Sequence, residues 1–352
     1  MPAVVCAALM DWSNVPKSLD PHDKSRGFGN IAIEAAFDSS QKLSAPLLYQ
    51  IRRTDGAGLM STIGSVLTQI GIAEWLGAEP VVDLRQGSAY QEELPVHGTR
   101  NVWEYYFGPV GDWGTKDIDS GEYRVLRSEE HHPIVHRDNK EETLRSLWQT
   151  YARYTDITSR AISEVTSHLS ISMDTIGVHI RSGDMRSYPG HPLPPTLKQL
   201  VATTKAFLDS SNFDSVFVAA QEVSAVQHMR KAFGSRLVES PSFKVGSRES
   251  RAVTPFSSGR THSRKPSSQD ARPHHRYLLG LEVLQDVTLL SSCGTLVSGI
   301  SNVSQWATIL TSGFREDPVV IDNGVNSSNR FMASITWPIR SILPAQWGGF
   351  PR

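Results

Sequence analysis

The sequence has few cysteines and no long apolar run. Its 352 residues include 2 cysteines, Cys6 and Cys293, so no disulfide framework is expected and a reducing compartment is allowed. No stretch approaches the roughly 20 consecutive apolar residues of a membrane-spanning helix. Residues 1–10 are apolar, but they lack the positive flank and the cleavage site of a signal peptide. The simplest interpretation is a cytoplasmic protein, although a luminal protein without its anchor would have the same composition.

An excess of charge of one sign is also absent. Lys and Arg number 35, Asp and Glu number 36, and the formal net charge is −1. This balance gives no global reason to expect nucleic acid or an anionic membrane as a partner. Hydrophobic residues make up 39% and charged residues 20% of the chain, as in ordinary globular proteins. A chain of this length can bury two ordinary cores.

Motifs that would indicate other chemistries are missing. There is no P-loop G-x-x-x-x-G-K-[ST], which argues against a PAPS-dependent sulfotransferase or another phosphate-handling α/β enzyme. Neither cysteine has metal-ligand spacing, and the pair His274-His275 lacks partners at such spacing, so we predict no metal site. N-glycosylation triplets begin at Asn302 and Asn326, but this pattern often arises by chance.

The predicted elements follow the order of an α/β protein. Asp55-Gly56-Ala57-Gly58 precedes apolar residues at helical spacing up to Gly77, and residues 80–84 are typical of a short buried strand. Aromatic residues gather in 101–110, and 141–169 is predicted to be one long helix. Strands are then predicted at 176–180, 216–220, 236–238, 295–298 and 319–321, alternating with helices at 196–208, 223–233, 277–291 and 302–310. Such alternation predicts a parallel, doubly wound sheet, whose ligands bind at the carboxyl ends of strands.

The same pattern suggests two domains. We expect an N-terminal domain over residues 1–170 and a C-terminal domain over 171–352, with a polar insertion at 244–275. The insertion is rich in Ser, Arg, Lys and Pro and has no apolar periodicity, as in long or disordered loops. It is either a solvated mobile loop or an electropositive flap that closes over a phosphate-bearing donor.

The strongest chemical signal is the run His179-Ile180-Arg181-Ser182-Gly183-Asp184 at the end of a predicted strand. Arg181 presents a planar fork of donors that matches phosphate oxygens. Gly183 allows close approach of the backbone to a ligand, and Asp184 can hold Arg181 or accept hydrogen bonds from a substrate. A buried structural Arg–Asp pair beside a core histidine would explain the same pattern.

This run resembles the H-x-R-x-x-D signature of the fucosyltransferase superfamily, which includes α1,6-, α1,2- and protein O-fucosyltransferases. Three other segments, 55–70, 101–107 and 286–307, resemble blocks of that superfamily in the same order. The resemblance implies a GT-B fold, with two Rossmann-like domains facing a central cleft. The C-terminal domain would bind GDP-fucose, and the N-terminal domain would help to bind the acceptor. It also implies a metal-independent, inverting transfer with no cofactor beyond the nucleotide sugar.

Residue roles follow from the resemblance position by position. Arg181 matches the arginine that contacts the β-phosphate, where it would stabilise the leaving diphosphate. His179 and Asp184 match nucleotide-binding or site-ordering positions. Asp286 matches the acid of the last conserved block and is also predicted to bind the nucleotide sugar. The turn Ser301-Asn302-Val303 matches a phosphate-binding helix start, and Ser301 is itself a good N-cap. The alternatives are a plain helix cap at Ser301 and a polar position on an apolar helix at Asp286.

The sequence departs from the superfamily pattern in two places, and both concern the identity of the sugar donor. Members of the α1,6 branch carry cations where this chain has Ser182 and Met185, so Arg186 or the basic insertion would have to compensate. The strand 216–220 is followed by Gln221-Glu222 rather than by paired acids. Glu222 is therefore the nucleotide-binding acid that we predict there. Without the second acid, the sequence does not indicate specificity for guanine.

No general base stands out. An inverting transfer needs a group that takes the acceptor proton, and the candidates are His191, Glu104 and Asp55. We therefore predict a transferase that moves fucose from GDP-fucose to an unknown glycan, peptide or small molecule. A transferase using another nucleotide sugar, or a non-catalytic nucleotide-sugar- or glycan-binding protein on the same scaffold, is the alternative.

Overall fold

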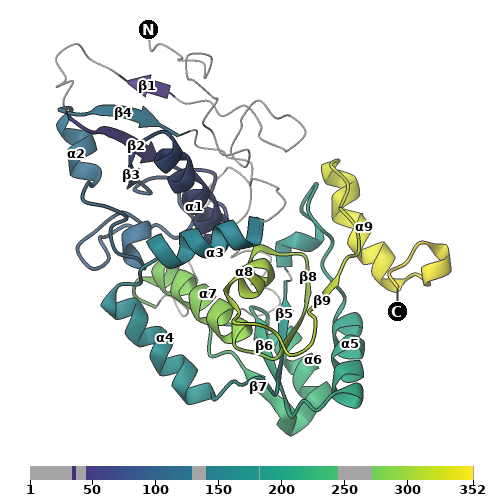
Figure 1. Cartoon of the computed structure of the whole chain (residues 1–352). Helices are drawn as coiled ribbons and strands as arrows, with labels where there is room; N and C mark the ends of the chain where they lie inside the picture. The colour runs from purple at the N-terminus through teal and green to yellow at the C-terminus, as the bar shows by residue number, and fades with distance from the viewer. Residues whose placement is uncertain (1–33, 37–44, 129–139, 182, 245–271, 352) are drawn as a thin grey trace. The chain divides into compact units, whose positions relative to one another are not determined.

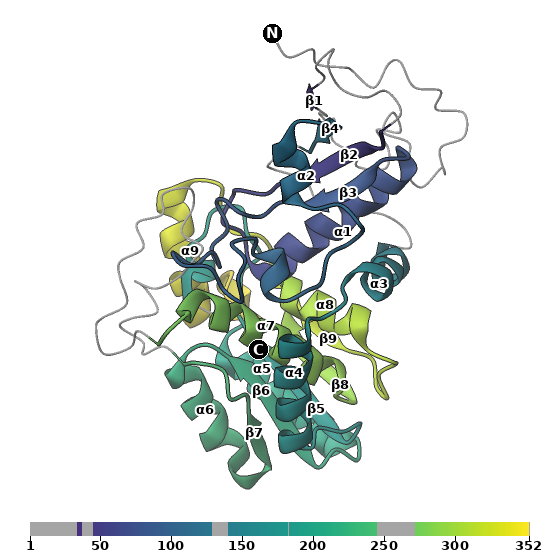
Figure 2. The same ribbon diagram turned by 90° about the vertical axis from the view of Figure 1, so that its left-hand side faces the viewer.

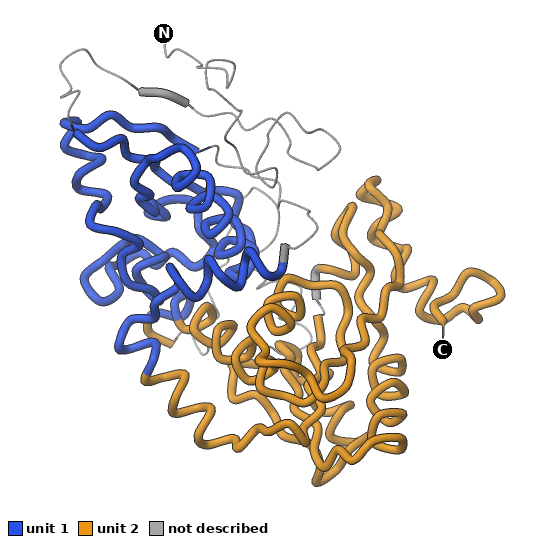
Figure 3. The backbone as a smooth tube through the Cα atoms, viewed as in Figure 1, with its two compact units in different colours: residues 1–159, 274–277 blue, residues 160–273, 278–352 orange. Residues whose placement is uncertain are grey.

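The computed structural model describes residues 34–36, 45–128, 140–181, 183–244 and 272–351. The chain divides into two compact units (Figure 3). Unit 1 comprises residues 1–159 with 274–277, and unit 2 comprises residues 160–273 with 278–352. Most of the predicted polar insertion, residues 245–271, lies outside the described residues.

Unit 1 is built on a mixed sheet with the strand order β1-β4-β2-β3. Strands β2 (Leu47–Ile51), β3 (Glu79–Val82) and β4 (Arg124–Arg127) are parallel, and β1 (Glu34–Ala36) is antiparallel to β4. Helix α1 (Leu59–Trp75) follows the predicted glycine turn and packs on β2 and β3 (Figure 2). A short helix, α2 (Thr115–Ser120), precedes β4. The sequence predicted α1 and β3, whereas β1, β2 and β4 were not predicted.

The predicted long helix 141–169 is wrong, because the chain forms two helices, α3 (Lys140–Tyr151) and α4 (Asp156–Leu169). The intervening residues hydrogen-bond to the aromatic segment instead. The Gly108 N–H donates to the Arg153 carbonyl at 2.8 Å, and the Thr155 N–H donates to the Tyr106 carbonyl at 3.0 Å. Thr155 Oγ1 then accepts from the Thr158 N–H at 3.2 Å, which caps the start of α4. Tertiary contacts therefore interrupt a stretch whose local pattern is helical.

Unit 2 is built on a five-stranded sheet in the order β7-β6-β5-β8-β9, and all its strands are parallel (Figure 1). The strands are β5 (Thr175–Ile180), β6 (Ser215–Ala220), β7 (Leu237–Glu239), β8 (Thr295–Gly299) and β9 (Val319–Ile321). The helices between them are α5 (Leu197–Ser210), α6 (Val223–Phe233), α7 (His275–Ser291) and α8 (Asn302–Leu310), with short 3-10 turns at Gly183–Arg186 (η5) and Gly234–Arg236. These strands and helices match the sequence prediction to within a few residues.

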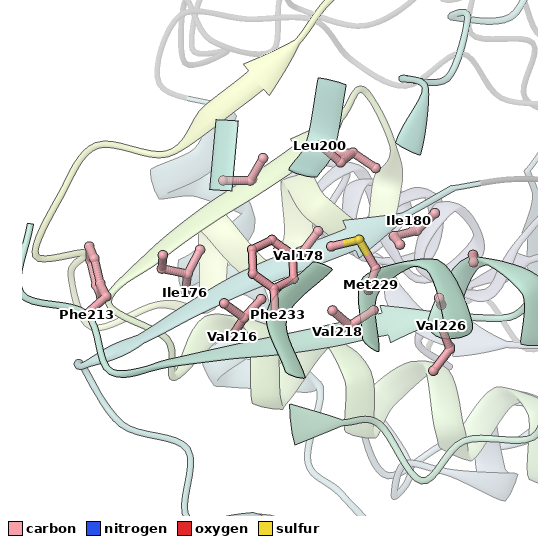
Figure 4. Close-up of a cluster of buried hydrophobic side chains, with 13 residues drawn as sticks. Ile176, Val178, Ile180, Leu200, Phe213, Val216, Val218, Val226, Met229 and Phe233 are labelled. Atoms are coloured by element: carbon pink, nitrogen blue, oxygen red, sulfur yellow. The ribbon is translucent and has the colours of Figure 1, made fainter. Parts of the chain in front are cut away.

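The core of unit 2 lies on both faces of this sheet. Alternate residues of a strand point to opposite faces, and Val216 and Val218 pack with Leu200 of α5 and Met229 of α6 (Figure 4). The intervening residues of β6 pack against residues of α7 and α8. Helices therefore cover both faces, which explains why β5 is buried along its whole length.

The end of unit 2 was not predicted. Helix α9 (Arg330–Ile342) begins at Asn329, whose side chain accepts hydrogen bonds from the N–H groups of Phe331 and Met332. A 3-10 turn at Ala345–Trp347 follows it. In the part of the chain that the structure describes, no helix has the length and apolar character needed to cross a membrane.

Candidate functional site

The strand order of unit 2 reverses between β5 and β8. From β5 the chain winds outward through β6 to β7, and α7 then returns it to β8 on the other side of β5. Neighbouring connections thus leave the carboxyl ends of β5 and β8 in opposite directions. In doubly wound sheets, ligands bind at such a reversal point. The predicted run His179–Asp184 and the predicted helix start at Ser301 both lie at these strand ends.

His179 and Ser301 meet across this reversal point. His179 is buried in β5, and its Nδ1 lies 3.1 Å from Ser301 Oγ. The same oxygen accepts from the Ser304 N–H at 3.1 Å, which makes Ser301 the N-cap of α8. Burial, together with the charge of Arg181, lowers the pKa of His179 to about 3. The imidazole is therefore neutral near pH 7 and acts as a hydrogen-bonding group rather than a proton carrier.

The start of α8 favours an anion. Asn302 and Val303 form its first turn and are partly exposed. The N–H groups of a first helical turn point out of the helix, and the helix dipole places positive charge there. Because Ser301 is tied to His179, this helix start is fixed to the end of β5.

Arg181 follows β5 directly and is partly buried. Arg181 lies two residues beyond His179 in the chain, and its positive charge adds to the lowering of the pKa of that histidine. Gly183 and Asp184 begin the 3-10 turn η5, and Met185 is buried. Ser182 and the side chain of Asp184 lie outside the described residues, so the predicted role of Asp184 stays a prediction.

Glu222 lies at the carboxyl end of β6 and begins α6. Its side chain is 7% exposed, and its Oε2 is 3.6 Å from Nη2 of Arg186. The carboxylate does not cap the helix that it begins. The Arg186 guanidinium also lies over the Trp337 ring, 4.6 Å from its centroid. The charge of Arg186, which was expected to compensate for missing cations, is thus partly offset by Glu222.

Asp286 belongs to a second polar cluster, at the end of β7. It accepts hydrogen bonds from the hydroxyl groups of Ser240 and Ser242. Burial raises the pKa of Asp286 to about 6, although the Ser240 bond and Lys244 oppose the shift. Lys244 Nζ donates to the carbonyls of Ser240 and Ser242, both at 2.8 Å, and burial lowers the pKa of Lys244. Asp286 therefore ties α7 to the segment that follows β7.

The three candidate bases differ in their neighbours and in their exposure. Asp55 accepts two hydrogen bonds from Arg53, both at 2.9 Å. Glu104 accepts from Thr99 Oγ1 at 2.5 Å and from the Asn101 side-chain amide at 3.0 Å. Both carboxylates thus order loops of unit 1. His191, in unit 2, is exposed and lies edge-on to Tyr188, with ring centroids 4.3 Å apart.

The aromatic segment of unit 1 serves its core. Trp103, Tyr105, Tyr106 and Phe107 are all buried, and the Tyr106 ring stacks on Tyr277 at 5.5 Å. These residues therefore pack rather than offer a stacking surface for a sugar.

Two sets of polar or aromatic residues in unit 2 were not predicted from the sequence. Ser240, Ser242 and Lys244 follow β7, and the rule that polar residues at strand ends bind ligands would have indicated them. Asn326 and Trp337 contact the segment after η5, and no local signal indicates them. Within the described ranges, no three His, Cys, Asp or Glu residues are grouped so that they could hold a metal ion.

No family model and no curated protein matches the sequence. Among solved structures, fucosyltransferase NodZ from Bradyrhizobium matches with a TM-score of 0.50 and 15% identity, over 76% of this chain and 94% of that chain. NodZ α-1,6-fucosyltransferase soaked with GDP-fucose matches with a TM-score of 0.49 and 16% identity, over 76% and 93% of the two chains. POFUT1 in its apo form matches with a TM-score of 0.44 and 9% identity, over 80% and 99%.

The likeness to NodZ confirms the predicted fold. This chain has a fucosyltransferase-like α/β fold of the GT-B class, built on two units with parallel strands. At 15% identity the likeness establishes the fold, whereas the donor and the reaction depend on the site residues.

Proposed function

We propose that this chain is a glycosyltransferase that transfers fucose from GDP-fucose to a nucleophile on a glycan, peptide or small molecule. The observation that carries the proposal is the meeting of His179 and Ser301 at the reversal point, beside Arg181 and the start of α8. The neutral imidazole of His179 can donate or accept a hydrogen bond. Arg181 and the positive end of α8 both attract the negative charge of a sugar diphosphate. The fucosyltransferase-like fold is consistent with this chemistry.

In this proposal unit 2 binds the donor. The diphosphate lies at the N–H groups of Asn302 and Val303, and Arg181 contacts its β-phosphate. As the acceptor oxygen bonds to the anomeric carbon, the bond from that carbon to the phosphate oxygen breaks, and its electron pair stays on the leaving diphosphate. Arg181 and the helix dipole stabilise this charge. They do so without a metal ion, and attack on the opposite face inverts the anomeric centre.

The acceptor proton needs a base, and we assign it to His191. His191 is exposed, whereas Asp55 and Glu104 are only partly exposed, so His191 is the most accessible of the three to an acceptor. Unit 1 would supply acceptor contacts. Glu104 stays the second candidate for the base.

A non-catalytic nucleotide-sugar-binding protein is the second candidate function. The ion pair between Arg186 and Glu222 favours it, because that pair leaves less positive charge for a leaving diphosphate. Turnover separates the two functions. A binding protein would be stabilised by nucleotide sugars without hydrolysing or transferring them.

The first test compares thermal unfolding with GDP-, UDP- and dTDP-sugars, followed by donor hydrolysis and transfer assays. GDP-fucose should raise the melting temperature most, and Arg181→Ala should lower turnover about 100- to 1,000-fold, as loss of a charge-stabilising donor does elsewhere. Arg315→Ala is the matched control, since Arg315 pairs with Asp174 just before β5, at the opposite end of the strand.

Two results would contradict the proposal. One is full turnover by a folded Arg181→Ala protein. The other is the absence of any stabilisation by the whole panel of nucleotide sugars.

A further inference from the structure

The segment that begins at Arg186, the last residue of η5, is bound to a distant part of the chain. We call residues 186–193 the site loop and residues 323–337 the C-terminal arm. The Gly190 N–H donates to the Ser327 carbonyl at 3.1 Å, and the Leu193 N–H donates to the Gly324 carbonyl at 2.8 Å. Pro192 and Val325 form an antiparallel bridge. The site loop, which carries Arg186 and His191, therefore depends on the arm for its conformation.

One buried side chain joins the two segments. Asn326 is 4% exposed, and its Nδ2 lies 3.4 Å from the Arg186 carbonyl oxygen, 3.3 Å from that of Tyr188 and 3.1 Å from that of Ala333. Its Oδ1 accepts from the Ser327 N–H at 2.9 Å. Replacing this amide would leave buried carbonyl groups with fewer donors, which is costly. The burial also shows that the glycosylation triplet at Asn326 does not present its side chain at the surface.

The arm also holds the side chain of Arg186. Trp337 lies under the Arg186 guanidinium and donates its Nε1–H to the Pro194 carbonyl at 2.8 Å. The same guanidinium is 3.6 Å from Oε2 of Glu222. Both the backbone and the side chain of Arg186 are thus fixed by the arm, and Arg186 in turn contacts the acid at the end of β6.

The position of Glu222 connects this arrangement with the donor. In doubly wound sheets, an acid at the end of the second strand of the nucleotide-binding half accepts hydrogen bonds from the ribose. Strand β6 is that second strand, because it follows β5 and lies beside it. Glu222 is nearly buried and does not cap α6. Its distance of 3.6 Å from Arg186 is that of an ion pair rather than a short hydrogen bond.

We propose that Asn326 and Trp337 are positioning residues of the donor site, which hold Arg186 so that it orients Glu222 toward the ribose hydroxyl groups of the nucleotide. This inference rests on the proposed function, since it assumes a nucleotide at the ends of β5, β6 and β8. Its consequence is specificity: the protein selects ribonucleotides over 2′-deoxyribonucleotides, and the C-terminal arm maintains that selection.

The test measures the affinities of GDP and UDP and of their 2′-deoxy counterparts for the full chain and its variants. The wild type should bind each ribonucleotide about 10-fold or more tightly than its 2′-deoxy form, as expected for a hydrogen bond to a charged group. Asn326→Ala, Trp337→Leu and Glu222→Ala should each bring this ratio close to one. In a transfer assay, the first two variants should raise KM for the donor more than they lower kcat.

Asn329→Ala is the matched control. It removes the cap of α9 and weakens that helix without touching the amide that joins the loop and the arm, so the ratio should stay at the wild-type value. Arg181→Ala should weaken the ribo and deoxy forms equally. If Asn326→Ala does not fold, Trp337→Leu, which keeps an apolar side chain but removes the ring under Arg186, carries the test.

The two proposals fail in different ways. If the wild type binds no nucleotide, the proposed function fails. If it binds GDP or UDP but the ratio is near one, or if the ratio is unchanged in folded Trp337→Leu and Asn326→Ala, the positioning role is wrong while the donor site stands.

Discussion

At the scale of single residues, burial moves two titratable groups of unit 2 away from their ordinary behaviour. His179 is held neutral, with its pKa lowered to about 3 from 6.5. Asp286 has its pKa raised to about 6 from 3.8. Both shifts arise mainly because burial disfavours the charged form. The two groups therefore contribute to stability with opposite dependences on pH.

His179 should make the protein less stable as the pH falls. Between about pH 3 and 6.5 the unfolded chain binds a proton at His179 and the folded chain does not. Its contribution is fully present above pH 6.5 and is lost progressively below it, by up to about 1.4 kcal/mol per pH unit. In urea unfolding at pH 7.5, 6.5, 5.5 and 4.5, the difference between wild type and His179→Gln should shrink as the pH is lowered.

Asp286→Asn is the control, because its effect on the free energy of unfolding should depend on pH in the opposite direction. The folded chain keeps a proton on Asp286 between about pH 3.8 and 6, so this contribution is largest at low pH and is lost as the pH rises through 6. The difference between wild type and Asp286→Asn should therefore shrink in the opposite direction, as the pH is raised. A parallel pH dependence for the two variants would contradict the burial-driven shifts.

At the scale of elements, the start of α8 contributes both to the stability of the fold and to the proposed donor site. Ser301 caps this helix and also contacts His179. Losing an N-cap costs about 1 kcal/mol, so Ser301→Ala should lower the free energy of unfolding by about that amount. It should also weaken nucleotide binding, because the helix start loses its tie to β5.

Thr155→Ala is the control for the cap alone. Thr155 caps α4, and its partners Thr158 and Tyr106 belong to unit 1. It should cost similar stability and leave nucleotide affinity unchanged. Equal losses of affinity in both variants would mean that the effect of Ser301 is a general weakening of the fold.

The elements also show why some predictions succeeded. The strands of unit 2 are short apolar runs between clear turn and helix signals, so their sequence pattern is sufficient to predict them. Strand β4 of unit 1, by contrast, has four residues with arginine at both ends, and its strand state depends on pairing with β1 and β2. The break between α3 and α4 depends in the same way on hydrogen bonds to Tyr106 and Gly108.

At the scale of the whole molecule, the two compact units have separate sheets. A ligand that binds only the folded state stabilises it by about 2.7 kcal/mol at 100 times its Kd. With saturating GDP-fucose, amide hydrogen exchange should therefore slow in β5, β8 and α8 of unit 2. Unit 1 strands β2 and β4 should change less. Protection confined to unit 1 would contradict the placement of the donor.

The sequence by itself determined the α/β class, the alternation of strands and helices in unit 2, and the positions of His179, Arg181 and Ser301 at or near strand ends. These follow from apolar periodicity, from turn residues and from the geometry of parallel strands, all of which are local in the chain. Tertiary structure decided which of these residues meet. It placed Ser301 against His179, joined Glu222 to Arg186 and brought Asn326 to the site loop from about 140 residues away. Such contacts depend on long-range packing, because a buried polar group takes whichever partner the fold brings within hydrogen-bonding distance.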